Sequence, residues 1–264
     1  MDNSHPQFSL SAQNLSVGRH AQALLSGVNF TLRPGSSLAI IGESGCGKTT
    51  LLQTLAGVLP AVGGAVRCES SQTGAKPVNA IVWQNLALFP WLTVADNLAL
   101  PLKLNRAGDI ASRVRAMLAE LELTGLERRF PSALSGGQRQ RLALGRALIA
   151  QPDILFMDEP FSALDAVLRE HLQHFLKRLR AHHPCTMVFV THDIGEATYL
   201  GENIMLLAAR PSRVAAFASN PTFTPDADVD VRGTDAFYAV QRRLHNAVVA
   251  VRQGREPVLE QGHW

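Results

Sequence analysis

Long uninterrupted hydrophobic runs, clustered cysteines and a strong net charge are all missing from this chain of 264 residues. The three cysteines, Cys46, Cys68 and Cys185, lie far apart and form no CxxC pair, which argues against a disulfide framework or a zinc site. A net charge of +3 is too small to indicate nucleic-acid binding by itself. With 46% hydrophobic and 18% charged residues, the composition is that of a folded globular protein with a reduced, cytoplasmic setting.

The most apolar stretch, residues 78–102, contains a single charged residue, Asp96. Amides and prolines interrupt it, and a spanning helix needs about 20 mostly apolar residues with an intact backbone ladder. The sequence therefore predicts that no segment spans a membrane and that any membrane contact goes through a partner. The first 17 residues lack a basic run and an apolar core, so we expect no signal peptide there.

Hydrophobic periodicity predicts an α/β fold. Residues 8–17 and 28–32 alternate apolar and polar side chains, as half-buried antiparallel strands do. Short apolar runs typical of buried strands occur at residues 38–41, 80–83, 154–157, 187–190 and 204–207. Helical spacing is found at residues 48–56, 114–121, 137–149 and 168–179. Such alternation favours a largely parallel sheet covered on both faces, with the helical middle of the chain as an inserted lobe.

The first chemical motif is a glycine-rich loop between a predicted strand and a predicted helix, and it matches G-x-x-x-x-G-K-[ST]. Its glycines allow backbone N–H groups to surround phosphates, and the following helix offers its positive end. Lys48 is the candidate cation for the β- and γ-phosphates, and the Thr49 hydroxyl is a candidate Mg²⁺ ligand. The candidate phosphate-binding residues are Gly42, Glu43, Ser44, Gly45, Cys46, Gly47, Lys48, Thr49 and Thr50.

The second motif is the apolar run 154–157, which ends in Asp158 and Glu159. A buried strand would deliver both carboxylates to the sheet edge beside the phosphate loop. Asp158 is the candidate for the Mg²⁺ shell, and Glu159 is the candidate general base for an attacking water.

The third motif, Leu134-Ser135-Gly136-Gly137-Gln138, resembles the LSGGQ signature of ABC ATPases. Further segments follow the order of that family. Gln84 resembles the Q-loop glutamine, residues 162–165 resemble the D-loop, and His192 resembles the switch histidine. The resemblance extends over about residues 8–218. It implies a P-loop NTPase (RecA-like) core with an N-terminal antiparallel β subdomain and an inserted α-helical subdomain.

The resemblance also implies a division of the chain and a set of roles. Residues 1–85 and 152–218 would form the ATP-binding core, residues 86–151 the helical signature subdomain, and residues 219–264 a C-terminal extension with one helix. ATP and Mg²⁺ would be bound, with Thr49, Gln84 and Asp158 at the metal, and Glu159 and His192 catalytic. Further nucleotide contacts would come from Gln84, Ser135, Gly136, Gly137, Gln138 and Asp165.

In ABC ATPases the signature of one subunit closes over the γ-phosphate held by another, so a head-to-tail homodimer is implied. The position of the aromatic residue that stacks on adenine in this family falls near Arg19 or His20, where no aromatic ring of Tyr, Phe or Trp is found. Either side chain could stack on a base instead. Ser36 also departs from the glutamate that many relatives carry.

An apolar cluster follows the Q-loop at residues 86–92, and such clusters in loops often mark partner sites. The resemblance implies a separate integral membrane permease here, with Phe89 and Trp91 as anchors; packing of both rings between the two lobes is the alternative. Residues 89–94 and 209–214 look like the nitrate, sulfonate and taurine group of bacterial importers. That group implies a solute-binding protein, uptake of a small solute and a peripheral location on the cytoplasmic face of the inner membrane.

Three other functions stay open. An ABC exporter differs mainly in its membrane subunit, so the sequence barely separates it from an importer. An ABC ATPase acting on nucleic acid would carry a long coiled coil between Lys48 and Ser135, and no sustained heptads occur there. A translation-type ABC protein would carry two cassettes, whereas this chain has one.

The C-terminal stripe of Phe237, Val240, Leu244, Val248 and Val251 predicts one terminal helix after a loop at residues 220–233. We expect the stripe to pack on the core, with partner binding as the alternative.

Overall fold

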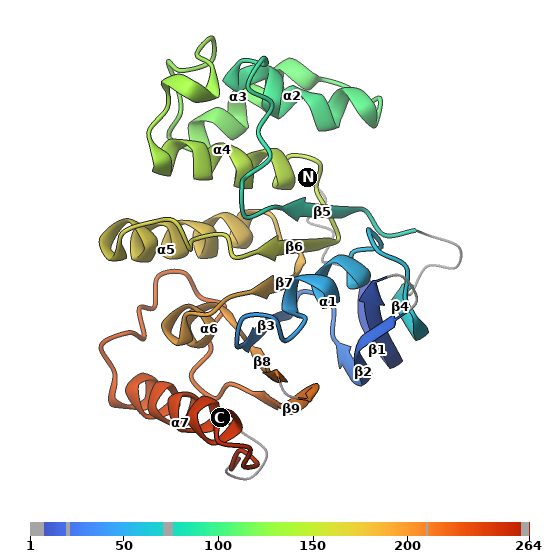
Figure 1. Ribbon diagram of the computed structural model, residues 1–264. Helices are drawn as coiled ribbons and strands as arrows, with labels where there is room; N and C mark the ends of the chain where they lie inside the picture. Colours follow the sequence, from blue (N-terminus) through green and yellow to red (C-terminus); the bar gives the residue numbers. More distant parts are fainter. Residues whose placement is uncertain (1–7, 20–21, 71–75, 210, 260–263) are drawn as a thin grey trace.

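The computed structural model describes residues 8–19, 22–70, 76–209, 211–259 and 264. Two sheets organise them (Figure 1). A three-stranded antiparallel sheet has the order β2-β1-β4, with β1 at Phe8–Arg19, β2 at Gln22–Leu32 and β4 at Gly63–Ser70. A six-stranded sheet has the order β5-β6-β7-β3-β8-β9, parallel except for β9 at its edge. Its strands are β3 (Ser37–Gly42), β5 (Asn79–Val82), β6 (Ile154–Asp158), β7 (Thr186–Val190), β8 (Asn203–Ala209) and β9 (Ser212–Ser219).

Seven α-helices occur among the described residues. Helix α1 (Lys48–Leu55) follows β3 directly, and α2 (Val94–Leu104), α3 (Ile110–Glu120) and α4 (Gly136–Leu148) group together beyond β5 (Figure 1). The short 3₁₀ turn Pro131–Ala133 precedes α4. The remaining helices are α5 (Ala166–His182), α6 (Ile194–Leu200) and α7 (Asp235–Arg252).

Both faces of the six-stranded sheet are buried. Along β3, Ala39 and Ile41 belong to one hydrophobic cluster, while Leu38 and Ile40 belong to the other. The first cluster includes side chains of α2 to α7, and the second includes α1 and the antiparallel sheet. Because alternate side chains point to opposite faces, a strand covered on both sides must be apolar throughout. The predicted α/β architecture with a doubly covered sheet is confirmed.

Several elements were not predicted from the sequence. These are β4, β9, α6 and, most notably, α2, which contains Pro101; the prolines of this stretch argued only against a membrane-spanning helix. The Thr93 side chain accepts from Asp96 N–H and caps the helix, and Leu98 and Leu102 are buried. The cap and the buried face offset the backbone hydrogen bond that Pro101 cannot make. The apolar stretch 78–102 is thus divided between β5 and α2, and no helix within the described ranges has the length and apolar character to cross a bilayer.

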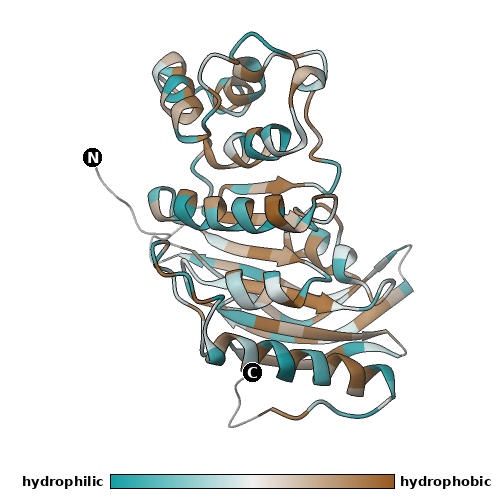
Figure 2. Ribbon diagram, turned by 90° about the vertical axis from the view of Figure 1, so that its left-hand side faces the viewer, coloured by the Kyte–Doolittle hydropathy of each residue, from teal (hydrophilic) through white to brown (hydrophobic). Residues whose placement is uncertain are grey.

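The C-terminal segment packs back on the core. After residues 220–233, which contain neither helix nor strand, α7 buries Phe237, Val240 and Leu244, so the predicted core-facing stripe is confirmed. The buried Trp264 adds to this contact, because its Nε1 donates to the Ile204 carbonyl of β8 at 3.0 Å. Figure 2 shows α7 beneath the largely hydrophobic strands, at the end of the molecule opposite the α2–α4 group.

Candidate active site

The glycine-rich loop joins the end of β3 to the start of α1. A Cβ on Gly42 would lie 2.6 Å from the Leu207 carbonyl oxygen, so only glycine fits there. Gly45 and Gly47 have φ values of 81° and 98°, in the left-handed region that favours glycine. Gly47 caps α1 without any side-chain hydrogen bond. The first N–H groups of α1 therefore have no side-chain cap and are available to an anion.

Lys48 supplies the positive charge of this loop. Its side chain is largely buried, and its Nζ donates to the carbonyl oxygens of Gly42 at 2.8 Å and Glu43 at 2.9 Å. No ion pair of Lys48 occurs among the described residues, so its charge is not neutralised by a carboxylate. Burial raises the pKa of the neighbouring Cys46 thiol, which keeps it neutral. The loop is therefore a compact cradle that holds the lysine cation inside it.

Thr49 and Asp158 form the second part of the site. The Thr49 hydroxyl donates to Asp158 Oδ1 at 3.0 Å, and Asp158 is only 6% exposed. Burial raises the pKa of Asp158, while the hydrogen bond from Thr49 lowers it. No group of three or more His, Cys, Asp or Glu side chains suited to a metal occurs in the part of the chain that the structure describes. The pair fits Mg²⁺, which commonly takes one or two protein oxygens and completes its shell with phosphate and water.

Glu159 is held at the point where three neighbouring strands end. Its φ of 46° is unusual for a non-glycine residue, and its N–H donates to the Val190 carbonyl at 3.0 Å. Its Oε2 accepts from Gln84 Nε2 at 3.2 Å and lies 3.6 Å from His192 Nδ1. Because Gln84, Glu159 and His192 follow β5, β6 and β7, the parallel sheet brings them to one edge.

A partly buried network supports the segment around His192. Arg169 donates to Asp193 Oδ2 at 2.7 Å and to the Leu164 carbonyl at 3.0 Å. It thereby links residues 162–165 to the residue after His192. Arg169 was missed at the sequence level because an arginine on a helix gives no local sign of such a bridge.

Glu196, in the first turn of α6, was also missed. It is 3% exposed and accepts from the Thr191 hydroxyl at 2.9 Å through Oε2, while Oε1 has no hydrogen-bond partner among the residues that the structure describes. Burial raises the pKa of this carboxyl to about 8. The carboxyl is therefore largely protonated at neutral pH, directly behind the His192 segment.

The signature residues lie apart from the phosphate loop. Ser135 and Gln138 form a reciprocal capping box at the start of α4, and a Cβ on Gly137 would lie 3.1 Å from the Leu168 side chain. Asp165 caps α5 by accepting from Leu168 N–H. Among the described residues, no hydrogen bond or ion pair joins Ser135, Gln138 or Asp165 to residues 42–50.

The segment after Gln84 is tightly organised. Arg146 donates to the carbonyl oxygens of Leu86 at 3.0 Å and Ala87 at 2.7 Å, and its guanidinium lies over the Phe89 ring. The fully buried Asn97 bonds both the N–H and the carbonyl of Phe89. Trp91, 5.6 Å from Phe89 between ring centroids, is 71% exposed. A rigid loop thus presents one large aromatic side chain outward.

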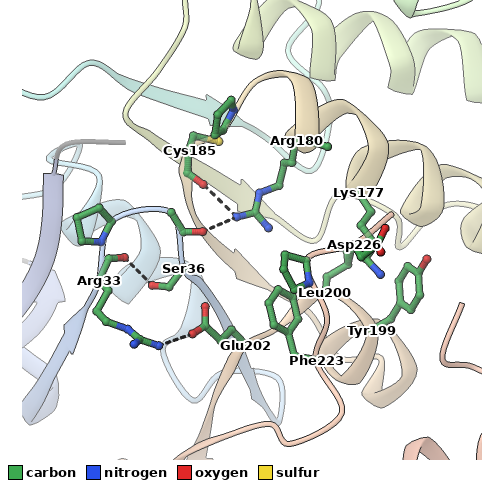
Figure 3. A pocket seen from close by; sticks show the side chains of 15 residues that line it. Arg33, Ser36, Lys177, Arg180, Cys185, Tyr199, Leu200, Glu202, Phe223 and Asp226 are labelled. Atoms are coloured by element: carbon green, nitrogen blue, oxygen red, sulfur yellow. Dashed lines mark hydrogen bonds and ion pairs between the residues drawn. The ribbon is translucent and has the colours of Figure 1, made fainter. Parts of the chain in front are cut away.

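Neither the predicted adenine position nor the large cavity of the structure adds a nucleotide contact. Arg19 is exposed at the end of β1, and His20 lies outside the described residues. A cavity of about 970 Å³ lies before the amino-terminal ends of β3 and β7 (Figure 3). An ion pair between Arg33 and Glu202 lines this cavity. Arg180 lies there too and donates to the carbonyl oxygens of Gly35 and Cys185. The cavity contains none of the predicted site residues, so it is separate from the phosphate loop.

A strand–loop–helix cradle with a buried Lys48, backed by the Thr49–Asp158 pair, defines a P-loop nucleoside triphosphatase. A family model described as "ABC transporter" matches residues 25–162. The chain belongs to the ABC transporter family, and it is an ATPase and ATP-binding subunit of that family.

Individual relatives agree with this assignment. The chain is 35% identical to the aliphatic sulfonates import ATP-binding protein SsuB of Bacillus cereus, over 84% of this chain and 86% of the relative. The SsuB protein of Bacillus subtilis is 38% identical to this chain, over 77% of this chain and 82% of the length of that relative. A solved dimeric cassette, MJ0796 bound to ADP and Pi, superposes with a TM-score of 0.68 at 29% identity, covering 81% of this chain and 100% of that one. The predicted family and fold class are confirmed.

Proposed function

We propose that this protein is the ATP-hydrolysing subunit of an ABC importer that takes up aliphatic sulfonates or a chemically similar small solute. The observation that carries the hydrolytic part is the convergence of Gln84, Glu159 and His192 on one sheet edge, beside the Thr49–Asp158 pair. Import and the solute class are supported by the names of the sulfonate-import relatives.

In this proposal each residue has one task. Lys48 would bind the β- and γ-phosphates, and Thr49 and Asp158 would hold Mg²⁺, which would neutralise charge on the phosphates. Glu159 takes a proton from the attacking water while the water oxygen bonds to the γ-phosphorus. The bond between the γ-phosphorus and the bridging oxygen of the β-phosphate breaks, which yields ADP and phosphate. Gln84 and His192 orient the Glu159 carboxylate through the Oε2 atom that both approach.

The second part of the proposal is a head-to-tail homodimer. Residues 135–138 open α4 away from their own phosphate loop, and the capping box occupies the N–H groups of Ser135 and Gln138. The N–H groups of Gly136 and Gly137 would then bind the nucleotide of another copy. Asp165 would lie at the same interface. The dimeric cassette among the solved relatives supports this arrangement.

The third part concerns the membrane partner. We place the permease at Trp91 and Phe89, because this loop is rigid, aromatic and outward-facing. The protein would then be peripheral at the cytoplasmic face, and import would require a solute-binding protein. Residues 1–85 with 152–218, residues 86–151 and residues 219–264 would act as the core, the signature lobe and the extension.

The decisive experiment replaces Glu159 with glutamine. Glu159→Gln should bind ATP, lose about 10²-fold or more in kcat, and accumulate as a dimer in ATP and Mg²⁺, because a general base contributes that much. Glu170→Gln, a change at an exposed position of α5, is the matched control and should keep native turnover. Native turnover by Glu159→Gln would remove Glu159 from the reaction.

The partner is tested with the same trapped protein. Tagged Glu159→Gln, held with ATP, should retain a multi-span membrane protein from detergent-solubilised membranes. Trp91→Ser in that background should lose it while still forming the dimer. Retention of only soluble protein or nucleic acid would contradict the transporter function.

A further inference from the structure

The end of the C-terminal helix reaches the phosphate loop. Arg252, the last residue of α7, places its Nε 2.6 Å from Glu43 Oε1. Residues 235–252 lie outside the segment matched by the family model, so this contact joins the C-terminal extension to the phosphate loop of the matched segment. The Arg252 side chain is 58% exposed and the Glu43 side chain is 38% exposed. The ion pair is therefore accessible to solvent and sensitive to salt.

Glu43 places a carboxylate in the phosphate loop, at a position that the motif leaves open. Its carbonyl accepts from Lys48 Nζ at 2.9 Å and from Cys46 N–H at 3.3 Å, so its backbone forms part of the cradle. Its carboxylate adds a negative charge to a loop whose electrostatics must favour a polyanion. A cation from elsewhere in the fold offsets that charge, and Arg252 is that cation.

We propose that Arg252 is a positioning residue for the nucleotide: it pairs with Glu43, offsets its charge, and so raises the affinity of the phosphate loop for ATP. The inference rests on the proposed function of that loop. It gives the C-terminal helix a task beyond packing.

The helix does not depend on this ion pair for its own position. Phe237, Val240 and Leu244 are buried against the core. Arg213 and Glu256 form a second ion pair at 2.7 Å just beyond α7. Loss of the Arg252 charge should therefore leave α7 in place and change only the electrostatics at Glu43.

The test is a double-mutant cycle read out as the Kd of a fluorescent ATP analogue. Arg252→Gln should weaken binding by about threefold at low salt, the size typical of an exposed ion pair, with kcat at saturating ATP unchanged. The difference should largely vanish at about 0.5 M salt, where charges are screened within a few ångströms. Glu43→Gln should bind at least as tightly as the native protein. Adding Arg252→Gln to it should have no further effect, because the Glu43 carboxylate no longer holds the guanidinium beside the loop.

The matched control is Arg242→Gln, which removes an exposed arginine from the same helix and should leave Kd unchanged. Native affinity of Arg252→Gln at low salt would overturn the inference. So would a threefold loss that persists in the Glu43→Gln background, because Arg252 would then act without Glu43. Native affinity of Lys48→Ala would instead refute the nucleotide site itself, which separates failure of the proposed function from failure of this inference.

Discussion

The buried carboxyl of Glu196 should make the stability of this protein fall as pH rises. In the folded protein its pKa is about 8, against an ordinary value of 4.5. Between these values the folded state holds a proton that the unfolded state has released. A group whose pKa is raised on folding contributes stability at low pH that is lost as pH approaches the folded pKa.

The size of the effect follows from the two pKa values. Linkage gives at most about 1.4 kcal/mol per pH unit, so between pH 5.5 and 7.5 Glu196 should lower the free energy of unfolding by about 2–3 kcal/mol. Glu196→Gln removes the titration and keeps an oxygen that can accept from the Thr191 hydroxyl. The variant should therefore show a pH dependence smaller by about 2–3 kcal/mol.

The assay is urea unfolding at pH 5.5, 6.5 and 7.5 for the native protein, Glu196→Gln and Glu170→Gln. Other titrating groups contribute equally to all three proteins, so the quantity to compare is the change between the pH extremes. The exposed Glu170→Gln control should follow the native protein. Identical pH dependence in the native protein and Glu196→Gln would refute the reasoning.

Three further changes test other parts of the structure. Lys48→Ala should raise the Kd for ATP by about tenfold or more, since charge-assisted hydrogen bonds to phosphate are lost; equal Kd values would contradict this. Arg169→Gln should lower kcat by about tenfold with little change in KM, because the His192 segment loses its bridge, whereas the exposed Arg178→Gln should not. Trp264→Ala should lower the free energy of urea unfolding by about 3 kcal/mol, as the buried ring and its bond to Ile204 are lost; a loss under about 1 kcal/mol would contradict the packing.

Locally encoded features were predicted well. The glycine-rich loop, the strand that leads into Asp158 and Glu159, and the helix that follows the signature depend on neighbouring residues in the chain. Their patterns are therefore visible without the fold. Prediction failed where packing overrides local preference. Helix α2 passes through Pro101 because its buried face and its cap compensate, and neither is apparent from proline alone.

By itself, the sequence determined the class of the protein, the phosphate loop and the candidate acids, because each is a short pattern with its own chemistry. Only the tertiary structure decided how those pieces meet. The parallel order of β5, β6 and β7 brings Gln84 and His192 to Glu159, and chain folding brings Arg252 to Glu43 across more than 200 positions. Such contacts depend on which elements pair over long distances, and no local pattern of residue types records that pairing.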